Sequence, residues 1–96
     1  MSPLKRKKLS KIRLKLDKLD NILIRIIKKR TNLVKKVLEH KENKNQIVDQ
    51  KRIESILKNI NQKSIKNNID PKITNRIWKN MIWSYIDFEK RNFRKK

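Results

Sequence analysis

The chain of 96 residues has no cysteine, no glycine, two prolines and one histidine. The absence of cysteine excludes disulfide bonds and thiolate metal sites, and His40 cannot build a zinc site by itself. No apolar run approaches the ~20 residues that span a bilayer, so we expect no transmembrane helix. No apolar segment follows the basic start of the chain, so we expect no signal peptide. A cytoplasmic location is therefore expected.

Acidic residues are also scarce. The chain has nine Asp and Glu residues and 29 Lys and Arg residues, which gives a formal net charge of +20. Such an excess is typical of proteins that bind nucleic acid. Two features weaken that interpretation. The chain is crowded with Lys, Asn and Ile, as expected from an A+T-rich genome, and its basic residues are spread over every predicted element. The same charge also attracts small anionic substrates.

The strongest pattern is an uninterrupted stretch from Leu9 to Lys41. One stripe of positions in it follows spacings of four and three, and all of these positions are apolar except Arg30, which lies between Ile26 and Leu33. The apolar members are Ile12, Leu16, Leu19, Leu23, Ile26, Leu33 and Val37. This spacing predicts a helix over about 9–41 that packs lengthwise on another helix. The helix would be about 48 Å long, whereas a compact domain of this size is roughly 30–35 Å across. We therefore expect a second copy of the chain to lie along it.

Two shorter helices are predicted after the long one. Asp49 is a good N-cap for a helix over about 49–63, and Asp70-Pro71 is a strong start for a helix over about 71–93. The apolar residues of the second helix are Ile53, Ile56, Leu57 and Ile60, and those of the third are Ile73, Ile77, Trp78, Met81, Ile82, Tyr85 and Ile86. Strand patterns are absent, so the predicted fold class is all-α. We expect one domain over 9–96 after a basic, disordered tail over 1–8.

Three charged residues occupy positions where apolar ones are expected. Arg30 lies on the stripe of the long helix, Lys41 lies about three turns further on nearly the same face, and Glu89 continues the stripe of the third helix. A buried lone charge is costly unless it is paired. These side chains therefore indicate a ligand, or pairing with one another. The alternatives are that Arg30 and Lys41 extend to water and that Glu89 pairs with a base on another helix.

The spacing of the charged residues resembles that of the all-helical chorismate mutase family. That family has an Arg early in its first helix, then Leu-Asp, a second Arg ten residues later, a Lys eleven residues further and Asp-x-x-Arg at the start of the second helix. The matching residues are Arg13, Leu19-Asp20, Arg30, Lys41 and Asp49-Gln-Lys-Arg52. Near its end the third helix of the family carries Gln or Glu, which Glu89 matches.

The resemblance implies an enzyme of aromatic amino acid biosynthesis in the shikimate pathway. It would be an isomerase that converts chorismate to prephenate without a metal or other cofactor, as an intertwined antiparallel homodimer with shared active sites. Arg13 and Arg30 lie about 25 Å apart along one helix, too far for one small substrate to touch both. In an antiparallel pair that crosses near Asn21, Arg13 of one chain approaches Arg30 of the other.

The resemblance also implies a role for each candidate residue. Arg13 of the partner subunit and Arg30 would hold the two carboxylates of the substrate, with help from Arg52. Asp49 would accept the ring hydroxyl, and Lys41 would donate to the ether oxygen. Glu89 would donate to the same oxygen when protonated.

Two residues depart from the family pattern, both at the hydroxyl end of the expected pocket. Ile53 stands where relatives often carry Glu, and its neighbour Glu54 lies about 100° further round the helix. Tyr85 stands where some relatives carry a small hydroxyl residue. The run Trp83-Ser84-Tyr85-Ile86 also resembles isochorismate-pyruvate lyase, a relative of the same fold.

Two alternative functions therefore stay open. Isochorismate-pyruvate lyase is the enzyme alternative. A basic helical nucleic-acid-binding protein is the alternative from another class, although it leaves Arg30 and Glu89 without an explanation. If the resemblance to chorismate mutases holds, we expect neither a membrane nor a nucleic acid as a partner.

Overall fold

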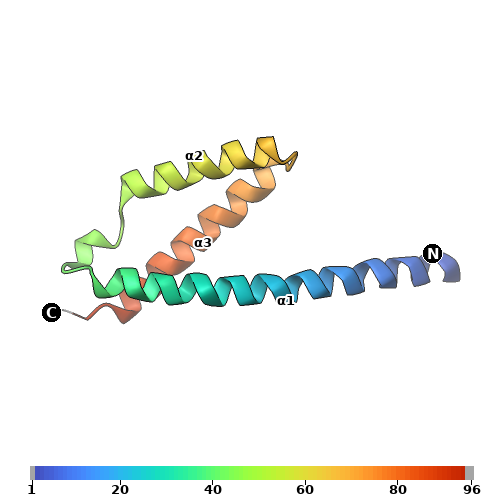
Figure 1. Cartoon of the computed structure of the whole chain (residues 1–96), viewed down its shortest axis with the longest axis horizontal. Helices are drawn as coiled ribbons and strands as arrows, with labels where there is room; N and C mark the ends of the chain where they lie inside the picture. The colour runs from blue at the N-terminus through green and yellow to red at the C-terminus, as the bar shows by residue number, and fades with distance from the viewer. Residues whose placement is uncertain (1, 95–96) are drawn as a thin grey trace. The chain divides into compact units, whose positions relative to one another are not determined.

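The computed structural model describes residues 2–94, and in this range it contains helices and no strand. The elements are α1 (Pro3–Glu39), a short 3₁₀ helix η1 (Lys44–Gln46), α2 (Gln50–Lys66) and α3 (Pro71–Asn92) (Figure 1). The predicted all-α class, with one long and two shorter helices, is confirmed. The chain divides into two compact units, Met1–Leu33 and Val34–Lys96. No helix in the described range is long and apolar enough to cross a membrane.

The long helix α1 starts earlier and ends sooner than the sequence pattern predicts. It begins at Pro3, so the prediction that residues 3–8 form a disordered tail is wrong. Proline suits the first helical position, and the hydroxyl of Ser2 accepts a hydrogen bond from the backbone N–H of Lys5 at 3.2 Å. Lys, Arg and Leu, which dominate this segment, are also good helix formers. The basic composition therefore does not prevent helix formation.

None of the residues of α1 is buried. The apolar stripe predicted for lengthwise packing is about half exposed along the whole helix, from Ile12 at 56% to Leu33 at 60% and Val37 at 53%. The pattern is thus present as predicted, and its apolar side chains are accessible to a partner.

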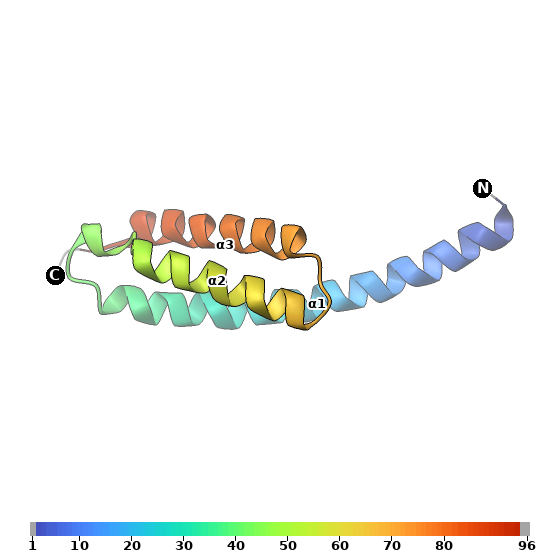
Figure 2. The same ribbon diagram turned by 90° about the horizontal axis from the view of Figure 1, so that it is seen from above.

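Helices α2 and α3 run in opposite directions and are joined by a short turn (Figures 1 and 2). The side chain of Asp70 accepts from the N–H of Lys72 and caps α3, as the sequence predicts. Near this turn the buried Ser64 hydroxyl bonds Thr74 Oγ1 and the carbonyl of Ile60, both at 2.6 Å. Helix α2 continues to Lys66, three residues beyond the predicted end.

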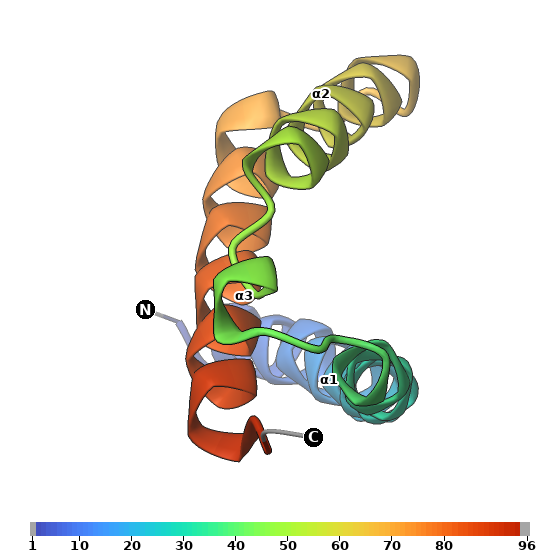
Figure 3. The ribbon, with the colours of Figure 1, turned by 90° about the vertical axis from the view of Figure 1, so that its left-hand side faces the viewer.

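Away from that turn α2 and α3 separate, and the segment with η1 lies against α3 (Figure 3). The buried core lies at this end of the unit, and it consists of Ile47, Ile53 and Ile86, with Leu38, Leu57, Ile82 and Phe93 packed against it. Its most buried member, Ile47, lies between the first two predicted helices, outside every apolar face that the sequence predicts. A small core of this kind leaves stability marginal unless association adds burial.

The predicted apolar face of α3 is only partly correct. Ile82 and Ile86 pack in the core, whereas Ile73 and Ile77 are about half exposed. At 100° per residue Ile77 lies about 180° round the helix from Ile86, so both cannot face the same core. The third helix therefore has a second apolar side that the single chain does not cover.

Candidate active site

The centre of the candidate site is an ion pair between Lys41 and Glu89. Nζ of Lys41 donates to Oε1 of Glu89 at 3.0 Å, across 48 residues of sequence. The two side chains are only 18% and 7% exposed. Pairing of the misplaced charges with one another, one of the explanations that the sequence allows, is therefore observed for these two residues.

The backbone around each partner explains why the two side chains meet. Lys41 lies just after α1, which ends at Glu39, two residues before the approximate end that the sequence predicts. The N–H of Lys41 still bonds the carbonyl of Leu38 at 3.1 Å, which keeps it against the end of the helix. Glu89 follows Ile86 by three residues, so it lies on the face of α3 that packs in the core.

Arg30 lies on α1 in the unit that ends at Leu33. Its Nε atom is buried and has no hydrogen-bond partner. A buried donor without an acceptor costs free energy, more so when it carries charge. This nitrogen is therefore suited to bind an anionic acceptor. Arg13, on the same helix, is exposed.

Asp49 and Arg52 interact with each other at the start of α2. The N–H of Arg52 donates to Oδ1 of Asp49 at 3.0 Å, so Asp49 is the predicted N-cap. Both residues are exposed, and within residues 2–94 no hydrogen bond or ion pair joins them to Lys41 or Glu89. Tyr85 is half-buried on α3, one turn before Glu89.

The next residue of α2, Ile53, is 8% exposed and packs with Ile47 and Ile86. The position where relatives often carry a carboxylate thus contributes to the core. Glu54 is exposed, as its place on the helix predicts. Neither residue offers a second acceptor for a ring hydroxyl beside Asp49.

Sequence reasoning missed Gln46, the last residue of η1. Its side-chain oxygen accepts from two successive backbone amides, those of Glu42 at 2.6 Å and Asn43 at 2.9 Å. The pattern Asn43-x-x-Gln46 is that of a capping box, and it could have been recognised from the sequence. The segment from Lys41 to Ile47 is therefore an ordered turn.

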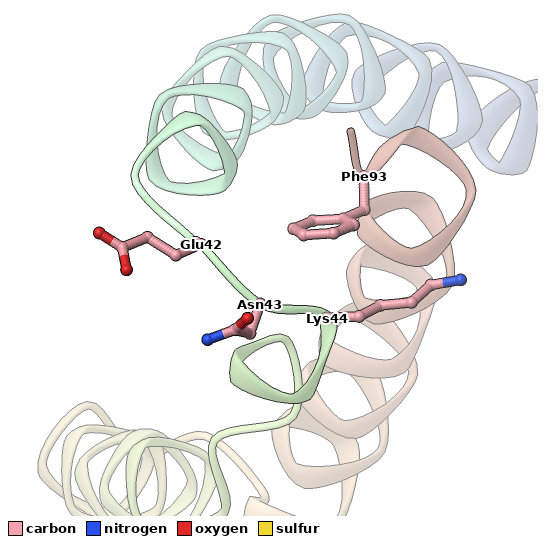
Figure 4. Close-up of a pocket in the computed structure, with 4 residues that line it drawn as sticks. All are labelled: Glu42, Asn43, Lys44 and Phe93. Atoms are coloured by element: carbon pink, nitrogen blue, oxygen red, sulfur yellow. The ribbon is translucent and has the colours of Figure 1, made fainter. Parts of the chain in front are cut away.

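A cavity of about 430 Å³ opens beside this turn and is lined by Glu42, Asn43, Lys44 and Phe93 (Figure 4). The ring of Phe93 faces the turn, while the charged ends of Glu42 and Lys44 point away from it in different directions. Charged groups do not converge in this cavity, so we do not assign the active site to it. In the described range no group of three His, Asp or Glu side chains could hold a metal ion.

Comparison with known proteins adds one match. Residues 12–90 match the family model described as chorismate mutase type II. The matched range covers most of the chain and includes Arg13, Arg30, Lys41 and Glu89. No match was found among curated proteins or among solved structures.

Proposed function

Because this chain belongs to the chorismate mutase type II family, we propose that it converts chorismate to prephenate. In this Claisen rearrangement the ether C–O bond of chorismate breaks while a new C–C bond forms within the same molecule. The protein would hold the reactive conformer and stabilise the charge that develops on the ether oxygen. The observation that carries the proposal is the buried ion pair of Lys41 and Glu89.

Lys41 would be the principal donor to the ether oxygen. Its ammonium has three N–H groups, and one of them donates to Oε1 of Glu89 at 3.0 Å. The pair limits the positions of the ammonium, and two donors are left for a substrate. Glu89 would donate to the same oxygen when protonated. In a water-poor site such hydrogen bonds are strongest where negative charge develops.

The two carboxylates of chorismate would be held by arginines. The buried Nε of Arg30, which has no hydrogen-bond partner, supports this role. A guanidinium binds a carboxylate through two parallel N–H bonds, which fixes the orientation of the ligand. Arg13 of the partner subunit would bind the second carboxylate, and Arg52 would assist there.

The ring hydroxyl would be accepted by Asp49. One of its carboxylate oxygens already caps α2 by accepting from the N–H of Arg52. The other oxygen is available for the substrate hydroxyl, because an ionised carboxylate accepts several hydrogen bonds. Tyr85 would line this end of the pocket.

The active unit would be an intertwined antiparallel homodimer. The apolar stripe of α1 is exposed along a helix of 37 residues, which is about 55 Å long. Burying this stripe against a second copy would remove a large apolar area from water. In an antiparallel pair Arg13 of one chain approaches Arg30 of the other, which completes two shared sites.

The deciding experiment measures the loss of chorismate absorbance, with identification of the product, for the wild type and Arg30→Ala. We expect prephenate from the wild type and a rate lowered by at least ~100-fold in the variant. A wild type that leaves chorismate unchanged would refute the proposal.

The same assay with isochorismate tests the enzyme alternative. The run Trp83-Ser84-Tyr85-Ile86 favours this alternative, and pyruvate release without prephenate formation would establish it. The net charge of +20 favours a nucleic-acid-binding protein instead. Tight binding of DNA or RNA with a steep salt dependence, together with inertness toward both metabolites, would establish that function.

A further inference from the structure

We propose that Gln46 is a positioning residue that sets the place of Lys41 through the backbone. This inference rests on the proposed function, because it concerns the group expected to donate to the ether oxygen. Gln46 itself touches no substrate in this proposal. Its side-chain oxygen binds the backbone of the turn that carries Lys41.

The bond at 2.6 Å is the decisive contact. The N–H of Glu42 belongs to the peptide group that joins Lys41 to Glu42. An acceptor held against that N–H restricts rotation about the bond that follows the Cα atom of Lys41. The same oxygen accepts from the N–H of Asn43 at 2.9 Å, so the next peptide group is fixed as well.

Gln46 is itself held in place by the short helix that it ends. Its N–H donates to the carbonyl of Asn43 at 3.0 Å, and the N–H of Ile47 donates to the carbonyl of Lys44 at 3.2 Å. Asn43 and Gln46 therefore bond each other in both directions. The turn contains neither glycine nor proline, so these hydrogen bonds, together with burial of Ile47, determine its shape.

The residue after Gln46 connects the turn to the helix that carries Glu89. Ile47 is 3% exposed and packs with Ile86, three residues before Glu89 on α3. One end of the turn thus places Lys41, and the other end is anchored on the same face of α3. The distance of 3.0 Å between Lys41 and Glu89 depends on both ends.

The variant that tests this role is Gln46→Met, which keeps the length of the side chain and removes its strong acceptor. Gln46→Glu restores an oxygen that can accept from both amides. Gln62→Met makes the same chemical change at an exposed position of α2 and is the matched control. Should Gln46→Met not fold, Gln46→Asn, which shortens the reach of the amide, takes its place under the same criteria.

We expect Gln46→Met to lower kcat about tenfold and to change KM little, because Lys41 acts on charge present only in the transition state. Gln46→Glu should recover most of kcat, and Gln62→Met should not change it. In a Lys41→Met background, Gln46→Met should lower kcat no further, since the group that it positions is gone. A further loss there, or equal loss in Gln46→Met and Gln62→Met, would overturn the inference.

A second measurement does not depend on catalysis. A double-mutant cycle of Lys41→Met and Glu89→Gln gives the coupling free energy between the two side chains, from the free energies of unfolding. The cycle is measured once in the wild-type background and once in the Gln46→Met background. We expect the coupling to be lost in Gln46→Met, with faster hydrogen exchange at the amides of Glu42 and Asn43. If this holds while the wild type does not convert chorismate, the proposed function fails and the positioning role stands. Unchanged coupling would refute the positioning role whatever the activity.

Discussion

Nζ of Lys41 and Oε1 of Glu89 lie 3.0 Å apart, and each is the only charged partner that the structure gives the other within residues 2–94. Glu89 is buried and Lys41 is mostly so. Two desolvated charges stabilise each other only while both are present. The pair therefore affects stability as well as the proposed chemistry, and variants can separate the two effects.

The first prediction concerns stability. Lys41→Met should lower the free energy of unfolding by about 3 kcal/mol, because it leaves the Glu89 carboxylate buried without a partner. The double variant Lys41→Met/Glu89→Gln should recover most of that loss. Denaturation in urea provides the measurement.

A surface pair provides the control for this prediction. Nε of Arg91 lies 2.8 Å from Oδ2 of Asp87, but both side chains are about two-thirds exposed. Arg91→Met should therefore change stability by less than about 0.5 kcal/mol. Equal losses in the free energy of unfolding for Lys41→Met and Arg91→Met would show that burial does not increase the contribution of the Lys41–Glu89 pair to stability.

The second prediction concerns the hydrogen bonding of residue 89 in the proposed reaction. An ionised Glu89 can only accept hydrogen bonds, whereas a glutamine can donate one to the ether oxygen. Glu89→Gln should therefore keep kcat for chorismate at or above that of the wild type. The test compares kcat of the two proteins at saturating chorismate. A large loss of kcat in Glu89→Gln would show that donation from this position does not assist the reaction.

The third prediction concerns sharing of the site between two chains. Arg13→Ala and Arg30→Ala should each be nearly inactive alone. After unfolding and refolding together in equal amounts, half of the dimers would be mixed, and each would hold one intact site. About one quarter of the wild-type activity should then return.

The control for this mixing experiment is Arg30→Ala refolded alone, which should recover nothing. Sedimentation should show a dimer throughout. A monomer that retains activity, or a mixture that stays inactive although mixed dimers form, would contradict the shared site.

The fourth prediction separates the two roles of Asp49. Asp49→Ala should lower the free energy of unfolding by about 1 kcal/mol through loss of the cap on α2. Asp49→Asn keeps an oxygen that accepts from the N–H of Arg52, so its stability should stay close to that of the wild type. Both variants should raise KM for chorismate if Asp49 also binds the ring hydroxyl. If only Asp49→Ala affects the enzyme, and only through stability, Asp49 is a cap alone.

Local chemistry explains which predictions from the sequence succeeded. Asp49 and Asp70 each bond a backbone N–H two or three residues away, so the start of each shorter helix could be found from neighbouring residues. The prediction of a disordered tail failed for residues 3–8, because it considered their positive charge and left out their high helix propensity. The turn at Gln46 was missed because a single capping box has no periodicity to reveal it.

The sequence by itself determined the three helices and the positions of misplaced charges, because caps and periodicity act within one or two turns of a helix. Only the tertiary structure decided that Lys41 meets Glu89 and that Ile73 and Ile77 do not face the core. These outcomes depend on how α2 and α3 separate and where the turn after α1 leads the chain. Such contacts join residues far apart in sequence, and side-chain packing selects them from many pairings that local patterns allow equally.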